Sequence, residues 1–459
     1  MILTVLSFVV ALGLLIAVHE YGHYRVAVAC GVKVLRFSVG FGKPLLRWKP
    51  QRQRPGQDTE FVLCAIPLGG YVRMLDEREA PVAADERHLA FNTQPLRARA
   101  AIVAAGPLAN LALAVLLYAA VAWIGVSAPQ PVLSTPTPAS LADRAGLRAG
   151  DWVTQAAVGE QAPSVVRSFD DLRWQLTQAA LDGEDMRLWV AEGEHGTPRA
   201  VLLPLSDLAR READLAMFQQ MGIVSPWSAP VMGELLPDGA AQAAGLRAGD
   251  RVRAVDDQPV SDAQTLRVLI RQGVSAQGQG VAQRWQIERD GGRVEVLVTP
   301  RPEQQNGQWV GRVGAFVGAP PAMVEVSEGL FGGLQNAVIR TGEVSWLTLK
   351  MMGRMLIGEA SLKNISGPIT IADYAGKSAS MGLTSYLTFM ALISVSLGVL
   401  NLLPLPVLDG GHLMYYLWEG LSGRALSDAW MERLQRGGVA VLMLLMVLAL
   451  FNDVARLLG

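Results

Sequence analysis

The stretch Leu15-Ile16-Ala17-Val18-His19-Glu20-Tyr21-Gly22-His23 decides the architecture, because it places two histidines at the end of a long apolar run. Residues 2–18 carry no charge, which predicts a membrane helix. On a helix, His19 and His23 lie one turn apart on one face, so that both imidazoles can reach one zinc ion, with Glu20 beside them as a general base. A histidine that only satisfies a core hydrogen bond is the alternative. Ionisable groups are costly in lipid, and this favours the functional interpretation.

The composition indicates a membrane protein of several units. A chain of 459 residues is too long for one compact domain. Its 51% hydrophobic and 18% charged residues are unlike those of a soluble enzyme. The formal net charge of −1 gives no electrostatic reason to expect a nucleic-acid partner. Cys30 and Cys64 have neither the spacing of a zinc pair nor that of a disulfide framework, and are predicted to be reduced thiols.

The first predicted span, residues 1–24, is expected to be retained, because no basic leader or small-residue cleavage site precedes His19. The following segment, 25–99, is rich in basic residues, and the positive-inside rule makes it cytoplasmic. The start of the chain then lies outside, and the histidine motif lies near the cytoplasmic end of its helix. The basic residues are Arg25, Lys33, Arg36, Lys43, Arg47, Lys49, Arg52 and Arg54.

Within this segment, short β-branched and aromatic runs predict strands, with turns at Gly40-Phe41-Gly42, Arg54-Pro55-Gly56 and Pro67-Leu68-Gly69-Gly70. Two interpretations remain open. One is a plain cytoplasmic hairpin. The other is a sheet that dips beside the histidine motif and offers an exposed edge to a substrate strand.

Three further spans are predicted, which makes four with both chain ends outside. Residues 100–126 form the second, and its Gly106-Pro107 and Asn110 favour a helix packed inside a bundle. Residues 378–412 form the third and 430–456 the fourth, although the last apolar run is short at 15 residues, 437–451. Residues 321–377, with helical spacing from Val324, predict an amphipathic region along the outer membrane boundary.

A repeat divides the segment between the second span and this amphipathic region. Ala145-Gly146-Leu147-Arg148-Ala149-Gly150-Asp151 recurs as Ala244-Gly245-Leu246-Arg247-Ala248-Gly249-Asp250, which predicts two similar modules outside the cytoplasm, 127–222 and 223–320. The pattern resembles bacterial PDZ domains, which implies a groove that binds an extended peptide or chain end. Gly222 and Ile223 are the expected carboxylate-binding loop of the second copy. The alternative is that the modules are spacers.

The H-E-x-x-H motif is typical of zinc peptidases, whose catalytic zinc needs a third protein ligand and an open position for water. The third predicted span runs inward and ends in Leu408-Asp409-Gly410-Gly411-His412. Asp409 therefore reaches the same cytoplasmic side as the two histidines. His412 is the rival ligand, because it lies three residues further on and is equally polar.

Together these motifs resemble the site-2 protease family of intramembrane zinc metalloproteases. The resemblance extends over essentially the whole chain, and it implies that Asp409 rather than His412 is the third ligand and that Asn401 holds the substrate backbone. Ser396 stands where related sequences often carry a second Asn, which weakens a two-Asn clamp. Two further matching stretches are Ser366-Gly367-Pro368-Ile369 and Ala449-Leu450-Phe451-Asn452-Asp453.

The implied fold is a polytopic α-helical membrane protein with four transmembrane helices, a membrane-associated β-hairpin or sheet and two PDZ-like α+β domains. The implied function is zinc-dependent cleavage of transmembrane segments in single-span proteins of a Gram-negative inner membrane. An anti-sigma factor already cut once is the expected substrate class, with remnant signal peptides as a second. The helix is expected to unwind against the sheet edge at Gly69 and Gly70. The alternatives are an inert membrane-anchored PDZ scaffold and a transporter, although no inverted repeat of the spans is visible.

Overall fold

The computed structural model describes residues 2–208, 215–305, 307–358 and 367–458. The chain divides into two compact units, residues 1–126 with 327–459 and residues 127–326. In the first unit, four of the described helices are long and apolar enough to cross a membrane, so the chain has the make-up of a membrane protein. They are α1 (Ile2–Ala29), α2 (Leu96–Ile124), α10 (Leu383–Asn401) and α12 (Asp428–Leu458).

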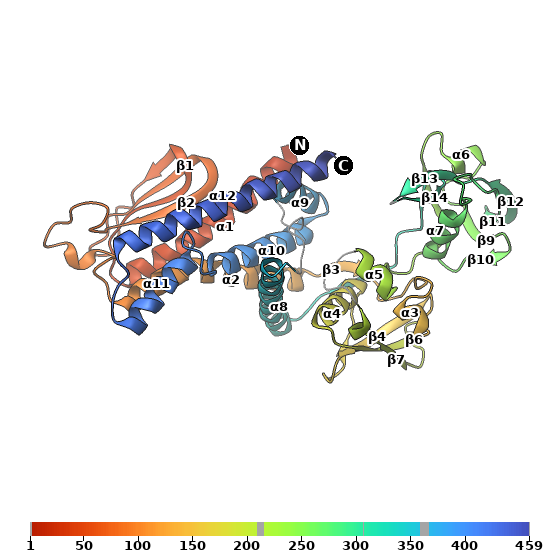
Figure 1. Ribbon diagram of the computed structural model, residues 1–459, viewed down its shortest axis with the longest axis horizontal. Helices are drawn as coiled ribbons and strands as arrows, with labels where there is room; N and C mark the ends of the chain where they lie inside the picture. The colour runs from red at the N-terminus through yellow and green to blue at the C-terminus, as the bar shows by residue number, and fades with distance from the viewer. Residues whose placement is uncertain (1, 209–214, 306, 359–366, 459) are drawn as a thin grey trace. The chain divides into compact units, whose positions relative to one another are not determined.

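Helix α2 is the centre of this first unit (Figure 1). It packs against α1 and α10, against α8 (Leu330–Leu356), and against α11 (Asp409–Ser422). Small residues let the backbones approach: a Cβ on Gly22 of α1 would lie 2.4 Å from the carbonyl oxygen of Ala105, and one on Gly398 of α10 would lie 3.0 Å from that of Pro107. Helix α1, which carries the two histidines, and helix α10, which carries Asn401, therefore lie close to α2.

A β-sheet packs against α1 and consists of β1 (Val34–Trp48) and β2 (Glu60–Met74). Residues 36–39 have partners on both sides, 70–73 and 60–63, whereas 44–48 pair only with 61–64. The chain therefore reverses within β1, at Gly40 and Gly42, whose φ values of 86° and 85° suit glycine. The outer side of residues 70–74 has no partner strand among the described residues. A 3-10 helix η1 (Arg87–Leu89) follows.

The second unit contains two hydrophobic cores, each built from a four-stranded sheet and a helix. The first core has the strand order β5-β4-β6-β7 with helix α4, and the second has β10-β9-β11-β12 with α7. The elements around the first core are α3 (Leu141–Arg144), β4 (Asp151–Val158), β5 (Ser164–Val165), α4 (Phe169–Asp182), β6 (Met186–Glu192), β7 (Arg199–Leu203), η2 (Leu205–Asp207) and α5 (Leu215–Met221).

The second module repeats this order of strands and helices and adds two short two-stranded sheets, β13-β14 and β15-β8. Its elements are β8 (Met232–Leu235), α6 (Ala240–Ala243), β9 (Arg251–Val255), β10 (Gln258–Pro259), α7 (Ala263–Gln272), β11 (Gln283–Arg289), β12 (Gly292–Val298), β13 (Arg301–Gln305), β14 (Gln308–Arg312) and β15 (Ala315–Val317). β16 (Met323–Val326) pairs with β3 (Val126–Pro129) and brings the chain back to its point of entry.

The repeated sequence motif has the same structure in both modules. Asp250 accepts a 2.8 Å hydrogen bond from the backbone N–H of Arg247 and pairs with Arg289 at 2.6 Å. Asp151 makes the equivalent bonds to the Arg148 N–H and to Arg199. Burial alone would raise the pKa of the Asp250 carboxyl, but the hydrogen bonds from Arg289 and Arg247 outweigh it and lower that pKa below its usual range. The final aspartate of the motif thus fixes the turn that leads into each sheet.

Several predicted boundaries differ from the structure. The first helix continues beyond residue 24 to Ala29, because Ala27 is buried together with Val32, Val34 and Ile102. The second begins at Leu96 rather than at residue 100, so it includes two arginines. The third predicted span, 378–412, is not one helix: α10 ends at Asn401 and a new helix starts at Asp409. Pro404 and Pro406 in between cannot continue a helical hydrogen-bond ladder.

The prediction for the segment 321–377 also needs correction, whereas the fourth predicted span, 430–456, agrees with a candidate membrane span at Ala429–Arg456. Residues 323–326 are a strand rather than the start of a helix, and α8 begins only at Leu330. Residues 359–366, which include Ser366, lie outside the described residues, as do 209–214 and 306 of the predicted modules. The short apolar run 437–451 is extended by its flanks, so that α12 has 31 residues.

Two distant motifs meet where α9 (Pro368–Ser380) begins. Asp453 of α12, which is 1% exposed, accepts hydrogen bonds from the backbone N–H groups of Gly367, Ile369 and Thr370 and from the Thr370 hydroxyl. Helix α9 has no side-chain cap of its own, so a carboxylate from another helix satisfies its free N–H groups. A Cβ on Gly367 would lie 2.5 Å from Asp453 Oδ2, so glycine is required there.

Candidate active site

Three side chains from opposite ends of the chain lie within contact distance of one another in the first unit. His19 and His23 lie one turn apart on α1, and Asp409 is the first residue of α11. The two Nε2 atoms are 3.2 Å apart, and Asp409 Oδ2 lies 3.2 Å from His19 Nε2 and 3.5 Å from His23 Nε2. All three side chains are largely buried, with exposed fractions of 14%, 11% and 20%.

These distances fit a metal ion. A zinc ion binds nitrogen and oxygen ligands at about 2 Å, so two ligands in a tetrahedral arrangement lie roughly 3.3 Å apart. The three separations observed here, 3.2, 3.2 and 3.5 Å, scatter around that value. Two imidazole nitrogens and one carboxylate oxygen are also the donor set that a catalytic zinc uses, with the fourth position left for water. The residues present therefore suit the zinc ion that the sequence predicts.

The orientation of His23 is fixed by α2. Its Nδ1 lies 2.8 Å from the carbonyl oxygen of Ile102, which can only accept a hydrogen bond. The proton of a neutral His23 therefore resides on Nδ1, and the lone pair of Nε2 faces His19 and Asp409. Gly106, one turn further along α2, lies against the same ring, because a Cβ there would be 2.2 Å from His23 Nε2. A backbone carbonyl and a glycine thus fix the orientation of the His23 ring.

Glu20 lies between the two histidines in sequence and faces the β-sheet. A Cβ on Gly70 would lie 2.9 Å from Glu20 Cγ and 3.0 Å from Ile16 Cγ2, so the backbone of β2 rests directly on α1 at this carboxylate. Gly69 has a φ of 105°, and a Cβ there would lie 2.2 Å from the ring of Phe41. The structure thus places Gly70 against Glu20. Gly69, which precedes Gly70, has a left-handed backbone conformation that favours glycine.

The tight connection between α10 and α11 positions Asp409. A Cβ on Gly410 would lie 2.2 Å from the carbonyl oxygen of Leu403, and one on Gly411 would lie 2.3 Å from that of Leu405. The two glycines therefore let the connection fold back onto the start of α11. His412 does not belong to the cluster of ligand atoms, and its ring packs edge-on against Tyr415 with 5.8 Å between the centroids.

The two predicted substrate-binding residues on α10 differ from each other. Asn401 is the last residue of the helix and is partly exposed, and its side chain makes no hydrogen bond within the described residues. Ser396 donates its hydroxyl to the carbonyl oxygen of Leu392 at 3.0 Å, within its own helix. Asn401 therefore has a free amide, whereas the hydroxyl of Ser396 is already engaged.

The contribution of α2 was missing from the sequence prediction. Ile102, Gly106 and Asn110 are spaced by four residues and face the two histidines. Ser394 of α10 is fully buried and donates its hydroxyl to the Asn110 carbonyl at 2.7 Å. The only available signal was the presence of Gly106, Pro107 and Asn110 in an uncharged span, which predicted packing but not proximity to the two histidines.

The prediction for Gly222 and Ile223 is wrong in one respect, because both belong to the first module rather than the second. Met221 and Ile223 are buried in the first core. The N–H of Gly222 donates to the Phe218 carbonyl at 2.8 Å, and its carbonyl accepts from the Thr137 N–H. The Gly222 N–H is therefore not available to a chain-end carboxylate.

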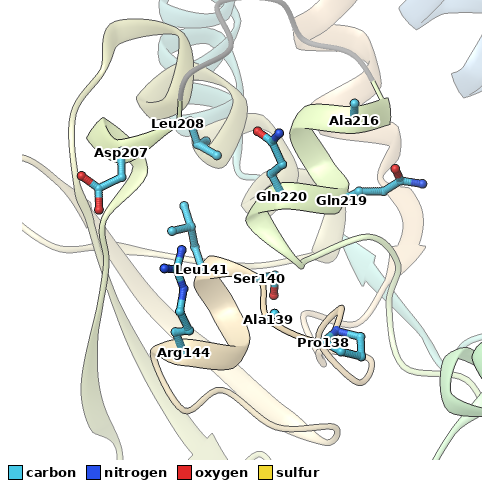
Figure 2. Close-up of a pocket in the computed structure, with 10 residues that line it drawn as sticks. All are labelled: Pro138, Ala139, Ser140, Leu141, Arg144, Asp207, Leu208, Ala216, Gln219 and Gln220. Atoms are coloured by element: carbon cyan, nitrogen blue, oxygen red, sulfur yellow. The ribbon is translucent and has the colours of Figure 1, made fainter.

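A polar pocket of about 590 Å³ lies elsewhere in the first module, between α3, η2 and α5 (Figure 2). None of the predicted site residues lines it. The pocket lining consists of Pro138, Ala139, Ser140, Leu141, Arg144, Asp207, Leu208, Ala216, Gln219 and Gln220.

Comparisons with known proteins identify the family of this chain. The model of peptidase family M50 matches residues 7–445. The chain is 43% identical over 466 residues to a candidate zinc metalloprotease of Ralstonia nicotianae, with 99% of each chain covered. It is 40% identical over 461 residues to the regulator of sigma-E protease RseP of Escherichia coli, and 39% identical over 477 residues to that of Salmonella typhimurium, with 98% of each chain covered. This chain belongs to peptidase family M50 and is a zinc metalloprotease of the site-2 type.

Proposed function

We propose that the protein cleaves transmembrane segments of single-span membrane proteins, with His19, His23 and Asp409 as zinc ligands and Glu20 as the general base. The observation that carries the proposal is the triangle of ligand atoms, spaced for one zinc ion and built on apolar helices. When bound, zinc supplies a Lewis acid that polarises the scissile carbonyl and activates a water. Glu20 accepts the proton of the attacking water and passes it to the leaving amine.

A helical substrate has to be unwound first, since its carbonyls are engaged in its own hydrogen bonds. The free side of residues 70–74 supports strand addition as the means, because an extended segment paired there replaces the lost backbone hydrogen bonds. Gly70 rests on Glu20, so a strand added at this edge would run beside the catalytic carboxylate. The free amide of Asn401 is suited to hold a second point of the substrate backbone. Ser396 contributes less, because its hydroxyl bonds within its own helix.

The substrate class is proposed from the relatives. Those of Escherichia coli and Salmonella typhimurium are named regulators of sigma-E, which points to an anti-sigma factor that has already been cut once, with remnant signal peptides as a further class. The proposed location is the inner membrane of a Gram-negative bacterium, with both termini and the second unit periplasmic and the zinc site toward the cytoplasm. Basic residues of the β1–β2 segment support this orientation. We further propose that the two modules are PDZ-like and bind a peptide or chain end.

Zinc content tests the ligand assignment. We expect the Asp409→Ala variant, purified as the full chain in detergent, to lose most of its zinc and all cleavage, because two imidazoles alone form an incomplete site. His412→Ala is the matched control and should keep its zinc, since its ring lies outside the ligand cluster. Elemental analysis measures both. An inert scaffold would carry no zinc in any form, and zinc loss in His412→Ala with retention in Asp409→Ala would reverse the assignment.

The second unit is proposed to act as a size filter that rejects substrates with a large periplasmic domain. Its excision is structurally feasible, because the N–H of Glu328 donates to the carbonyl oxygen of Ala122 at 2.9 Å and Trp123 Nε1 to that of Leu330 at 3.1 Å. A short glycine linker in place of residues 127–326 should therefore leave the first unit intact.

We expect this deletion variant to cleave both the intact and the pre-shortened form of a single-span substrate, whereas the full chain cleaves only the shortened one. Gel analysis of both substrates measures the selection. The deletion variant that also carries Glu20→Gln is the control for contaminating proteases. Continued rejection of the intact substrate, with the short one still cut, would show that the filter resides elsewhere.

A further inference from the structure

Helix α2 contacts both histidine ligands, but it holds them by different chemical groups. His23 Nδ1 donates to the backbone carbonyl of Ile102, which allows a single tautomer. His19 Nδ1 instead lies 3.4 Å from the Asn110 side chain, two turns further along α2. A side-chain amide, unlike a carbonyl, presents a donor at one end and an acceptor at the other. The tautomer of His19 therefore depends on which end of the amide faces it.

Asn110 is held in place but is only half satisfied. The residue is 1% exposed, and its backbone carbonyl accepts the buried hydroxyl of Ser394. Its Nδ2 faces His19 Nδ1, while its Oδ1 is buried with no hydrogen-bond partner among the described residues. Buried polar atoms almost always have a partner, so an unpaired amide oxygen beside a metal site requires an explanation.

The two orientations of the amide have opposite consequences for the metal. With Nδ2 toward the ring, the amide donates to Nδ1, and the proton of a neutral His19 is on Nε2. That proton then points between His23 and Asp409, into the position that the metal would take. A half-turn of the amide brings Oδ1 to the same place, where it accepts the Nδ1–H and leaves the Nε2 lone pair free for the metal.

We propose that Asn110 is a positioning residue whose side-chain oxygen accepts the Nδ1–H of His19 in the metal-bound state and so holds the tautomer that binds zinc. This inference rests on the proposed role of His19 as a ligand. When zinc binds, the side-chain amide of Asn110 rotates by half a turn. Its Oδ1, which has no partner among the described residues, then accepts the hydrogen bond from His19 Nδ1.

Zinc affinity of the full chain in detergent, measured by competition with a chelator, tests the proposal. Asn110→Leu keeps the approximate size but removes the acceptor, and we expect it to raise the zinc dissociation constant by about 10- to 100-fold. Asn110→Asp retains an acceptor and should bring the constant back to within about threefold of the wild-type value. The matched control is Thr341→Val, which removes another buried hydroxyl from the first unit at a site on α8 and should leave the constant unchanged.

The nitrogen-15 shifts of the His19 imidazole provide a readout that packing alone would not move. In zinc-loaded wild type, the Nδ1–H of His19 should show the shift of a proton that is hydrogen-bonded to an amide oxygen, and this shift should be absent in zinc-loaded Asn110→Leu, where the acceptor is missing. An equal loss of affinity in the Leu and Asp variants would indicate packing and overturn the proposal, as would wild-type affinity in Asn110→Leu. Absence of zinc from the wild-type chain would contradict the proposed function itself, and this result differs from every outcome that concerns Asn110 alone.

Discussion

Glu20→Gln is expected to abolish cleavage of a single-span substrate while zinc stays bound. Gln has the size of Glu but cannot accept a proton from water at neutral pH, and loss of a general base costs roughly 10²- to 10⁴-fold in rate. The proposed zinc ligands are His19, His23 and Asp409, whose mutual distances do not involve the Glu20 carboxylate. Initial cleavage rates in detergent, with the cut located by mass spectrometry, measure the loss. Elemental analysis measures the retained zinc.

A matched control separates this loss from a general effect of removing a negative charge. Glu432 lies on α12, is 62% exposed and pairs with Arg436. Glu432→Gln should cleave at the wild-type rate, because an exposed ion pair contributes little to stability. Cleavage by Glu20→Gln at a rate near that of wild type would rule out Glu20 as the base. Loss of zinc in that variant would show instead that the carboxylate supports the metal site.

Gly106→Ala is expected to have the second large effect, because one added methyl group collides with the proposed metal ligand His23. The new Cβ would lie 2.2 Å from His23 Nε2, 2.6 Å from Cε1 and 2.8 Å from Cδ2. Ordinary van der Waals contact begins near 3.4 Å, so the ring has to move by about 1 Å. That shift breaks either the hydrogen bond to Ile102 or the triangle with His19 and Asp409. Zinc content and cleavage should both fall by more than about tenfold.

Two further variants show whether the collision is the cause. Gly13→Ala adds the same methyl group to α1 at a position with no atom within 4 Å, and it should leave zinc content and cleavage intact. In a His23→Ala background the obstructing ring is gone, so Gly106→Ala should cost far less thermal stability than it does in wild type. Equal destabilisation in both backgrounds would assign the effect to the packing of α1 on α2 instead.

Local patterns were enough to predict two of the three side chains that cluster in the structure. His19 and His23 share a face wherever the chain is helical, since a spacing of four residues places them one turn apart. Asp409 required the direction of the third span to be inferred as well, and spacing alone did not exclude His412. That decision needed the fold of the α10–α11 connection, where Gly410 and Gly411 bring the backbone back on itself and His412 packs against Tyr415.

The contribution of α2 could not be predicted, because it depends on how one helix is rotated against another. Ile102 acts through a carbonyl that every residue possesses, so its identity carries no signal. Helix ends were misplaced where polarity was used as the criterion. Arg97 and Arg99 lie inside α2, and Arg99 pairs there with Glu419 of α11 at 2.6 Å. The module assignment of Ile223 failed because a boundary in sequence does not reveal which core an apolar side chain enters.

Because Asp453 of α12 caps the start of α9, α9 can be capped only after α12 has been synthesised. A chain emerges from the ribosome with its N-terminus first, so α9 is complete long before the residue that caps it exists. Until α12 arrives, the N–H groups of Gly367, Ile369 and Thr370 have no acceptor from that helix. The junction between α9 and α12 is therefore complete only after Asp453 has been translated. A premature stop codon shortly before Asp453 would yield a chain that contains His19, His23 and Asp409 but lacks the carboxylate that caps α9.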